Sequence, residues 1–430
     1  MTDLDGRICR QCVGDPILSA WITEEGAQGS CEICSDERTS VPISDLKWRI
    51  DEVFKSHFRP GFGADAATIF MKIAGIPESL ARSLHEELSE LYGQLEARGK
   101  SDNHYDAEEF VEDGPIEPPD NGRWSAFQTT IRRDARFFNN EAEAWLDDIF
   151  TGLHSQRTWD GDEVVVEYAP DAPKSGFFRA RYAPNERKLA EILSDPASQL
   201  GPPPNGMAAP GRMNAAGLSV FYGAVEKETC ISEIRAPVGS SVVIGRFELI
   251  RPIRLLHLDR LARVAHQGSH FDPDYWGKRN RIYILPAIVR QIARPVMPGD
   301  EALGYLPTQF VADYLAQRLE PAIDGILFRS TQTNAAGQNV VLFNRACRVE
   351  PIDPSIELTV HCGMDEPHEP DLSLSLTVRK RAEPPPTEAR RDWSDQRSNT
   401  LRLDLDSIEV REIRATLYEA PLRQFSLYRR

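Results

Sequence analysis

The sequence predicts a multidomain α+β protein, and three features along its 430 residues support that fold class. Paired cysteines lie near the N-terminus, apolar residues at helical spacing follow them, and short β-rich segments dominate after about residue 158. A single hydrophobic core seldom serves more than roughly 250 to 300 residues, so several domains are expected. We predict four, at residues 1–44, 45–157, 158–354 and 355–430.

The first domain is predicted to be a zinc ribbon. Cys9 and Cys12 form one CxxC pair, and Cys31 and Cys34 form a second pair after eighteen intervening residues. This spacing lets two hairpins supply four thiolates to a tetrahedral structural zinc site. The segment has too little apolar bulk to fold without the metal. A redox-active CxxC pair is the alternative.

Residues 45–157 are predicted to form a helical bundle. Apolar side chains recur every three or four positions, at Leu80, Leu84, Leu88, Leu91 and Leu95, and again at Trp145, Ile149 and Leu153. Each series lies on one face of an amphipathic helix. Pro77 and Ser79 stand where the N-terminus of the first helix is expected.

The last two domains are predicted from β-rich segments. Residues 164–166, 218–222, 242–247 and 339–343 suggest strands of an α+β domain, and a helix is expected over about residues 308–319. After Pro354, three segments alternate apolar and polar residues, which is typical of half-buried strands. We expect these three strands to form an added small sheet.

Composition excludes several classes of partner. Lys and Arg number 50 against 66 for Asp and Glu, which gives a formal net charge of -16 that opposes a phosphate backbone, so no nucleic acid is expected. The sequence shows no secretory signal at its start and no apolar run of the ~18 residues that a membrane span needs. Three of the seven cysteines lie singly outside the CxxC pairs, which is typical of a reducing compartment. We therefore expect a cytoplasmic protein.

Five segments carry a family resemblance: FFRAR, APGRMN, SVFYGAVEKETCISEI, GYLPTQFVADYLAQ with DGILFRS, and GQNVVLF. In their order and spacing they resemble the RES family, which is named for a characteristic Arg, Glu and Ser. Upstream, the CxxC pairs and the stretch RRDARFFNN resemble the HEPN/RES N-terminal module. HEPN ribonucleases need a nearby Arg and His, but RRDARFFNN contains no His, so we expect the helical region to be a scaffold.

The resemblance implies an ADP-ribosyltransferase-like fold and an enzyme that consumes NAD. The implied reaction is cleavage of the nicotinamide-ribose bond by an NAD glycohydrolase or phosphorylase, in a bacterial toxin of a toxin-antitoxin or antiphage defence system. Its implied partners are NAD and an antitoxin or other inhibitory protein. Whether the protein forms a homo-oligomer is left open. Two alternatives are an ADP-ribosyltransferase that modifies a macromolecule and a catalytically inactive nucleotide-binding regulatory protein.

The resemblance also assigns site residues. Glu233 in CISEI, expected in the first turn of a helix, would oppose positive charge on the ribose, and Arg179 in FFRAR would bind phosphate in bidentate fashion. The signature serine is Ser330, with Thr308 and Gln309 as the alternative position. The expected catalytic residues are Glu233, Arg179 and Ser330, and the expected NAD-binding residues are Arg179, Arg181, Arg212, Tyr222, Thr308 and Gln309.

Overall fold

The computed structural model describes residues 6–113, 121–135, 138–172, 175–266, 268–294, 299–333, 336–364, 372–381 and 395–415. The chain divides into two compact units, each described here by itself. Unit 1 comprises Met1–Asp120 and His266–Ile284, and unit 2 comprises Asn121–Ala265 and Leu285–Arg430. Helix α11 (Tyr275–Ala293) contributes residues to both units.

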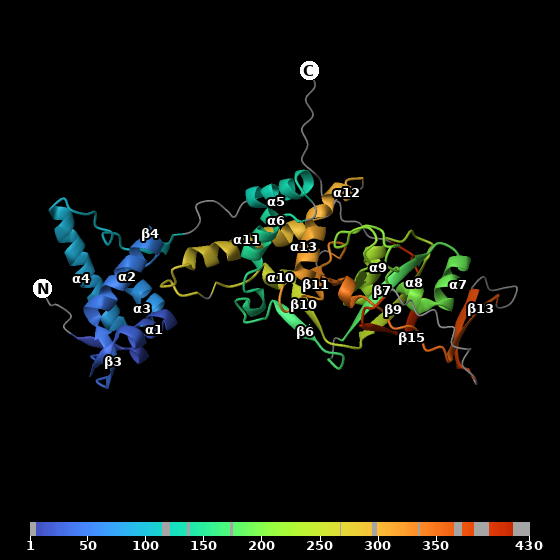
Figure 1. Cartoon of the computed structure of the whole chain (residues 1–430), viewed down its shortest axis with the longest axis horizontal. Coiled ribbons are helices and arrows are strands. Elements are labelled where there is room, and N and C mark those ends of the chain that lie inside the picture. Colours follow the sequence, from blue (N-terminus) through green and yellow to red (C-terminus); the bar gives the residue numbers. More distant parts are fainter. Residues whose placement is uncertain are drawn as a thin grey trace, which may run out of the picture. The chain divides into compact units, whose positions relative to one another are not determined.

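Unit 1 combines a small sheet with helices (Figure 1). Its three strands pair antiparallel in the order β1 (Arg7–Cys9), β3 (Glu37–Pro42) and β2 (Ala27–Ser30). A second antiparallel pair joins β4 (Phe58–Ala64) and β5 (Phe110–Glu112). The helices are η1 (Arg10–Cys12), α1 (Pro16–Glu25), α2 (Ile43–His57), α3 (Ala66–Ala74) and α4 (Glu78–Ala97).

The predicted helix over residues 80–95 is confirmed as α4, which buries Leu80, Leu84 and Leu88. These leucines share one hydrophobic core with Ile8 of β1 and Val41 of β3. The small sheet and the helices that follow it are therefore packed together, because neither has enough apolar surface for a core of its own.

Unit 2 is built on a mixed eight-stranded sheet (Figure 1). Only the β10–β11 pair is parallel among its described strand pairs. The strands, in spatial order, are β15 (Leu401–Glu412), β9 (Ser241–Leu249), β7 (Gly176–Ala183), β8 (Phe221–Ala224), β12 (Gln338–Leu342), β11 (Gly325–Arg329), β10 (Ile253–His257) and β6 (Val165–Tyr168).

Helices cover both faces of this sheet, as the burial of alternate strand residues requires. On β9, Val243 and Phe247 pack into a core with residues of α7 (Glu186–Ser194) and α8 (Pro196–Leu200). Val242 and Ile244 face the other side and pack with α9 (Lys227–Ile234). The remaining elements are α5 (Asn121–Arg133), α6 (Asn140–Phe150), η2 (Leu153–Ser155), α10 (Leu258–Leu261), α12 (Glu301–Gly304), α13 (Leu306–Gln317) and η3 (Asn344–Ala346).

Helices α5 and α6 belong to unit 2, although they fall within the predicted helical domain. Phe127 of α5 packs edge-on against Phe310 of α13, and Phe150 of α6 stacks on Tyr314 of the same helix. The helical segments of residues 45–157 are thus divided between the two units. The division into four domains stays a prediction.

The C-terminal strands differ from the expected small sheet. Strands β13 (Ile356–Met364) and β14 (Leu372–Lys380) pair with each other, but β15 pairs antiparallel with β9 at the edge of the large sheet. Leu401 and Leu403 are buried there in the main core of unit 2. Their alternating pattern predicted a strand correctly but could not predict its partner.

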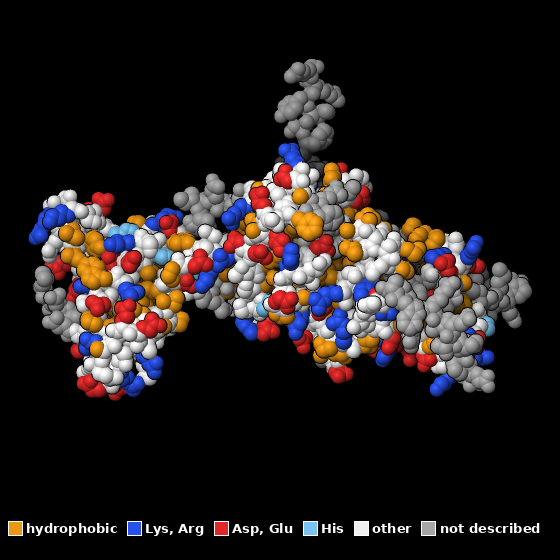
Figure 2. All heavy atoms as spheres, in the orientation of Figure 1, with side chains coloured by type: hydrophobic (Ala, Val, Ile, Leu, Met, Phe, Trp, Pro, Cys, Tyr) orange, Lys and Arg blue, Asp and Glu red, His pale blue; other side chains and the backbone are white. Residues whose placement is uncertain are grey.

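The molecular surface mixes charges of both signs. On the face shown in Figure 2, acidic and basic side chains are interspersed, with hydrophobic side chains between them. None of the helices in the described part of the chain is both long and apolar enough to cross a membrane.

Candidate active site

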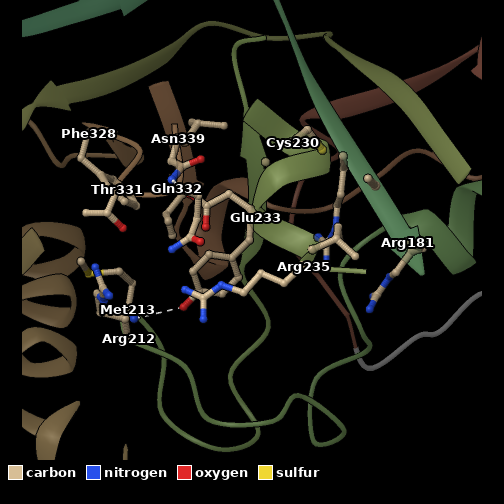
Figure 3. A pocket seen from close by; sticks show the side chains of 17 residues that line it. Arg181, Arg212, Met213, Cys230, Glu233, Arg235, Phe328, Thr331, Gln332 and Asn339 are labelled. Carbon is tan, nitrogen blue, oxygen red and sulfur yellow. Dashed lines mark hydrogen bonds between the residues drawn. The ribbon is translucent and has the colours of Figure 1, made fainter. Parts of the chain in front are cut away.

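A cavity of about 350 Å³ in unit 2 brings together most of the predicted site residues (Figure 3). Strands β7, β8 and β12 lie side by side, and helix α9 packs against all three. The sheet therefore aligns Arg179, Arg181, Tyr222 and Asn339 along the cavity, and α9 adds Glu233. Arg212 enters from the loop that precedes β8.

Glu233 lies in the last turn of α9 rather than in the first turn, so that expectation was wrong. The helix begins at Lys227, directly after the turn that follows β8, and this earlier start moves Glu233 to the C-terminal end. The negative end of a helix dipole does not favour a carboxylate. Side chains from the sheet must therefore hold Glu233 in place.

Two neutral donors orient the Glu233 carboxylate. Ser330 Oγ donates a hydrogen bond to Glu233 Oε1 at 2.6 Å, and Asn339 Nδ2 donates to the same oxygen at 2.7 Å. Oε2 has no partner within the described residues, and the residue is exposed at the cavity. One carboxylate oxygen is thus fixed while the other is available to a ligand.

The predicted serine holds Glu233 instead of lining the cavity. Ser330 is fully buried just after β11, and its Oγ also accepts a hydrogen bond from the backbone N–H of Gln332 at 3.1 Å. The cavity wall is formed by its neighbours Thr331 and Gln332. Ser330 is therefore placed as a positioning residue.

Arg179 is a buried cation that forms no ion pair with any described residue. Its residue is only 8% exposed, its guanidinium lies 5.2 Å from the centre of the Phe221 ring, and Nη1 has no hydrogen bond within the described residues. Burial, together with the nearby charge of Arg181, lowers the pKa of Arg179 to about 9. Burying an unpaired charge is costly, so this position suits a residue whose counter-charge arrives with a ligand.

The other two predicted arginines make hydrogen bonds to backbone. Arg181 donates from Nε to Gln199 O at 3.0 Å and from Nη2 to Gly201 O at 3.3 Å, and burial lowers its pKa. Arg212 donates from Nη1 to Ala293 O at 3.0 Å. Both arginines still line the cavity, although part of each guanidinium is used in hydrogen bonds to the backbone.

Tyr222 also has structural partners. Its hydroxyl donates to Asn214 Oδ1 at 2.8 Å and accepts from Met213 N at 3.1 Å, and burial raises its pKa to about 12. The hydroxyl thus holds the loop that carries Arg212. Only the ring remains available to a ligand, because the oxygen is already occupied.

Thr308 and Gln309 are not part of the cavity wall. Thr308 Oγ1 donates to Arg212 O at 2.5 Å, and Gln309 Nε2 donates to Gly211 O and Asn214 O, each at 2.8 Å. Both residues of α13 therefore anchor the same loop. The structure brings Ser330, not Thr308, to the carboxylate of Glu233.

Asn339 and Arg235 are two of the cavity residues that the sequence analysis did not identify. Asn339 lies within the segment GQNVVLF, and its Oδ1 is buried without a partner. A carboxylate can only accept, so the amide nitrogen must face Glu233 and Oδ1 must point elsewhere. Arg235, two residues after Glu233, also lines the cavity. Only a three-dimensional arrangement could single out either residue.

The four paired cysteines cluster in unit 1. Their Sγ atoms all lie within 4.8 Å of one another, with separations of 3.7 Å for Cys9–Cys12 and 3.8 Å for both Cys9–Cys34 and Cys12–Cys31. A tetrahedral zinc site with Zn–S bonds of about 2.3 Å separates its sulfurs by about 3.8 Å. The cluster could hold a metal ion, and its geometry fits zinc with four protein ligands.

The cavity of unit 2 combines four arginines with an accessible carboxylate, and among the described residues Arg179 Nη1 has no hydrogen bond. A comparison with protein families is more specific. Residues 178–361 match the family model described as RES domain, so the chain contains a RES domain over that segment.

The other comparisons add no relative. No curated protein and no solved structure matches the chain. The ADP-ribosyltransferase-like fold therefore stays a prediction. The family match begins at residue 178, so the HEPN/RES N-terminal module also stays a prediction.

Proposed function

We propose that this protein cleaves the nicotinamide-ribose bond of NAD, with water or phosphate accepting the ADP-ribosyl group. The observation that carries the proposal is the arrangement of Glu233, which Ser330 and Asn339 fix through Oε1. Its Oε2 is available at a cavity where Arg179 Nη1 has no hydrogen bond among the described residues. The RES domain match is consistent with NAD as the substrate.

The proposed chemistry places positive charge opposite Glu233. The bond between ribose C1′ and the nicotinamide nitrogen breaks with both electrons leaving on nicotinamide, so charge builds on the ribose ring. A preorganised carboxylate stabilises this oxocarbenium-like transition state more than it stabilises the substrate. Water then adds at C1′ and releases a proton to solvent, or phosphate adds in its place.

Arg179 is proposed to bind the NAD pyrophosphate. A guanidinium can donate two parallel hydrogen bonds to phosphate oxygens, and such charge-assisted bonds are strong in a site shielded from water. Arg181 and Arg212 supply further positive charge, and the Tyr222 ring offers a surface for stacking. The four cysteines of unit 1 would hold zinc in a structural role.

An enzyme that consumes NAD damages the cell that makes it. We therefore propose a role as a toxin or antiphage defence effector whose activity is restrained by an inhibitory protein. Co-purification of the chain with the products of neighbouring genes tests this role.

The test of the activity is incubation of the purified full chain with adenine-labelled NAD. We expect stoichiometric release of nicotinamide together with labelled ADP-ribose, or its phosphorylated form when phosphate is present. Label attached to protein would instead indicate an ADP-ribosyltransferase. Unchanged NAD over hours would favour the catalytically inactive nucleotide-binding protein.

A further inference from the structure

We infer that Arg235 is a ligand-binding residue that contacts a phosphate of the bound dinucleotide. This inference deepens the proposed function and rests on it. It gives the proposed phosphate site a second cation beside Arg179. It also identifies the diphosphate as a group that the cavity recognises. The argument comes from the backbone of Arg235, from its missing partners and from its place beside Glu233.

The backbone of Arg235 is strained. The residue is the C-cap of α9, with φ 51° and ψ 40°, in the left-handed region. Glycine is the usual residue there because a Cβ atom is disfavoured in this conformation. We take a large side chain in such a position at a cavity as one argument for a functional role of that side chain.

The Arg235 side chain has no hydrogen bond or ion pair among the residues that the structure describes. Unlike Arg181 and Arg212, it makes no hydrogen bond to backbone, and no carboxylate lies within ion-pair distance of it among the described residues. Figure 3 shows the side chain extending into the cavity, on the same side as Glu233. The guanidinium is thus presented to whatever fills the cavity.

A phosphate fits this arrangement better than a neutral group. Among the described residues, the cavity wall carries four arginines, at positions 179, 181, 212 and 235, against one acidic residue, Glu233. A planar guanidinium matches the geometry of two phosphate oxygens. A cation near the C-terminus of α9 also interacts with the helix dipole, but lysine would satisfy that interaction equally well.

The test compares Arg235→Gly, Arg235→Lys and Arg235→Gln in the full chain. Binding of ADP-ribose and of adenosine is measured by calorimetry, and thermal unfolding is measured without ligand. Arg187→Gln is the matched control, since Arg187 is an exposed arginine of α7 outside the cavity. It removes one positive charge from unit 2 and should leave both measurements unchanged.

We expect Arg235→Gly to act in opposite directions on stability and binding. Relief of the left-handed strain should raise Tm by about 1 to 3 °C, whereas ADP-ribose affinity should fall roughly tenfold to a hundredfold. Arg235→Gln should lose the same affinity without the gain in Tm, and Arg235→Lys should lose less. Adenosine, which has no phosphate, should bind all variants alike.

Failure of this inference is distinguishable from failure of the proposed function. If Arg235→Gly and Arg235→Gln bind ADP-ribose within twofold of the unchanged chain, or if the unchanged chain binds no ADP-ribose, the inference is wrong. If ADP-ribose binding depends on Arg235 but NAD is not consumed, the inference stands and the proposed enzymatic function is wrong.

Discussion

Each unit contains a cavity with a glutamate in its wall, and the two glutamates differ in the groups that contact their carboxylates. In unit 1, a cavity of about 700 Å³ includes Glu112, whose Oε1 contacts Arg279, Tyr275 and His270. Burial alone would raise the pKa of Glu112, but His270, Tyr275 and Arg279 together lower it below its usual value. Among the described residues of unit 2, Glu233 accepts from two neutral donors, Ser330 and Asn339, and Arg179 Nη1 has no hydrogen bond.

The comparison separates charges that are compensated inside the protein from charges for which we propose a functional role. Where a buried charge is compensated inside the protein, its removal mainly affects folding. Where the protein leaves a charge uncompensated at a cavity, the compensation is expected from a ligand. By this criterion the larger cavity, in unit 1, is the weaker candidate for catalysis.

Loss of the metal should have the largest effect, and only on unit 1. Cys31→Ser should abolish binding of the one zinc ion expected per chain and expose the amides of α1 and α2 to hydrogen exchange, because structural zinc sites contribute on the order of 10 kcal/mol to folding. NAD cleavage by unit 2 should change less than about threefold, since no cavity residue there is a metal ligand. Cys347→Ser is the control and should keep its zinc. Unchanged zinc content in Cys31→Ser would show that the site is assigned wrongly.

Substitution of the two glutamates should separate catalysis from folding. Glu233→Gln should slow NAD cleavage by roughly 10²- to 10³-fold while ADP-ribose affinity stays nearly constant, because the lost charge matters mainly in the transition state. Glu112→Gln should leave the rate within about threefold and destabilise unit 1. Initial rates of nicotinamide release measure the first effect, and hydrogen exchange of β5 measures the second. Near-normal turnover by Glu233→Gln would rule out the proposed catalytic centre.

Replacement of the two buried arginines by methionine should affect stability differently, with a loss in unit 1 and no loss in unit 2. Arg279→Met leaves Glu112 without its cation and should destabilise unit 1 by roughly 1 to 4 kcal/mol. Arg179→Met removes an unpaired buried charge and should leave unit 2 equally stable or up to about 2 kcal/mol more stable, while the KM for NAD rises. Hydrogen exchange of β5 and β7 reports on each unit. Destabilisation of β7 by Arg179→Met would mean that Arg179 has a structural partner in solution.

Acidification should have the smallest effect of the four. Burial, followed by the charge of His270, lowers the pKa of His57 in unit 1 below its usual value of about 6.5, so the folded state takes up a proton less readily than the unfolded state. The contribution of neutral His57 to the stability of unit 1 is therefore fully present above about pH 6.5. It is lost as the pH falls below that value, by at most about 1.4 kcal/mol per pH unit. His57→Phe keeps a ring for the stack on Trp276 and should flatten the pH dependence of hydrogen exchange in α2. An unchanged dependence would assign the effect to other histidines.

Local sequence patterns were sufficient to predict individual helices and the cysteine cluster, which depend on the spacing of nearby residues. The leucine periodicity predicted α4, and the CxxC spacing predicted the cysteine cluster. The RES resemblance named Arg179, Glu233 and Ser330, which the fold brings to one site although two of the three are separated by 97 positions. The hydrogen-bond partners and the burial of these three side chains could not be predicted from the sequence.

Features that depend on distant contacts could not be predicted. Ser330 was expected to contact the ligand, but it contacts Glu233 instead of lining the cavity. Its place depends on where β11 ends, at Arg329, and on the position of the helix that carries Glu233. The partnerless Oδ1 of Asn339 and the left-handed backbone of Arg235 leave no trace in a sequence pattern. The pairing of β15 with β9 joins residues more than 150 positions apart, and no local rule selects it.

Strand β15 makes the folding unit longer than the family segment. The family match ends at residue 361, but β9 needs Leu401–Glu412 to satisfy its outer row of backbone groups. A fragment cut at residue 361 would present β9 as an open edge, and such edges recruit strands from other chains. For biochemical work the practical limits of this domain are therefore set by the completeness of the sheet, and we expect a fragment that follows the family limits to aggregate.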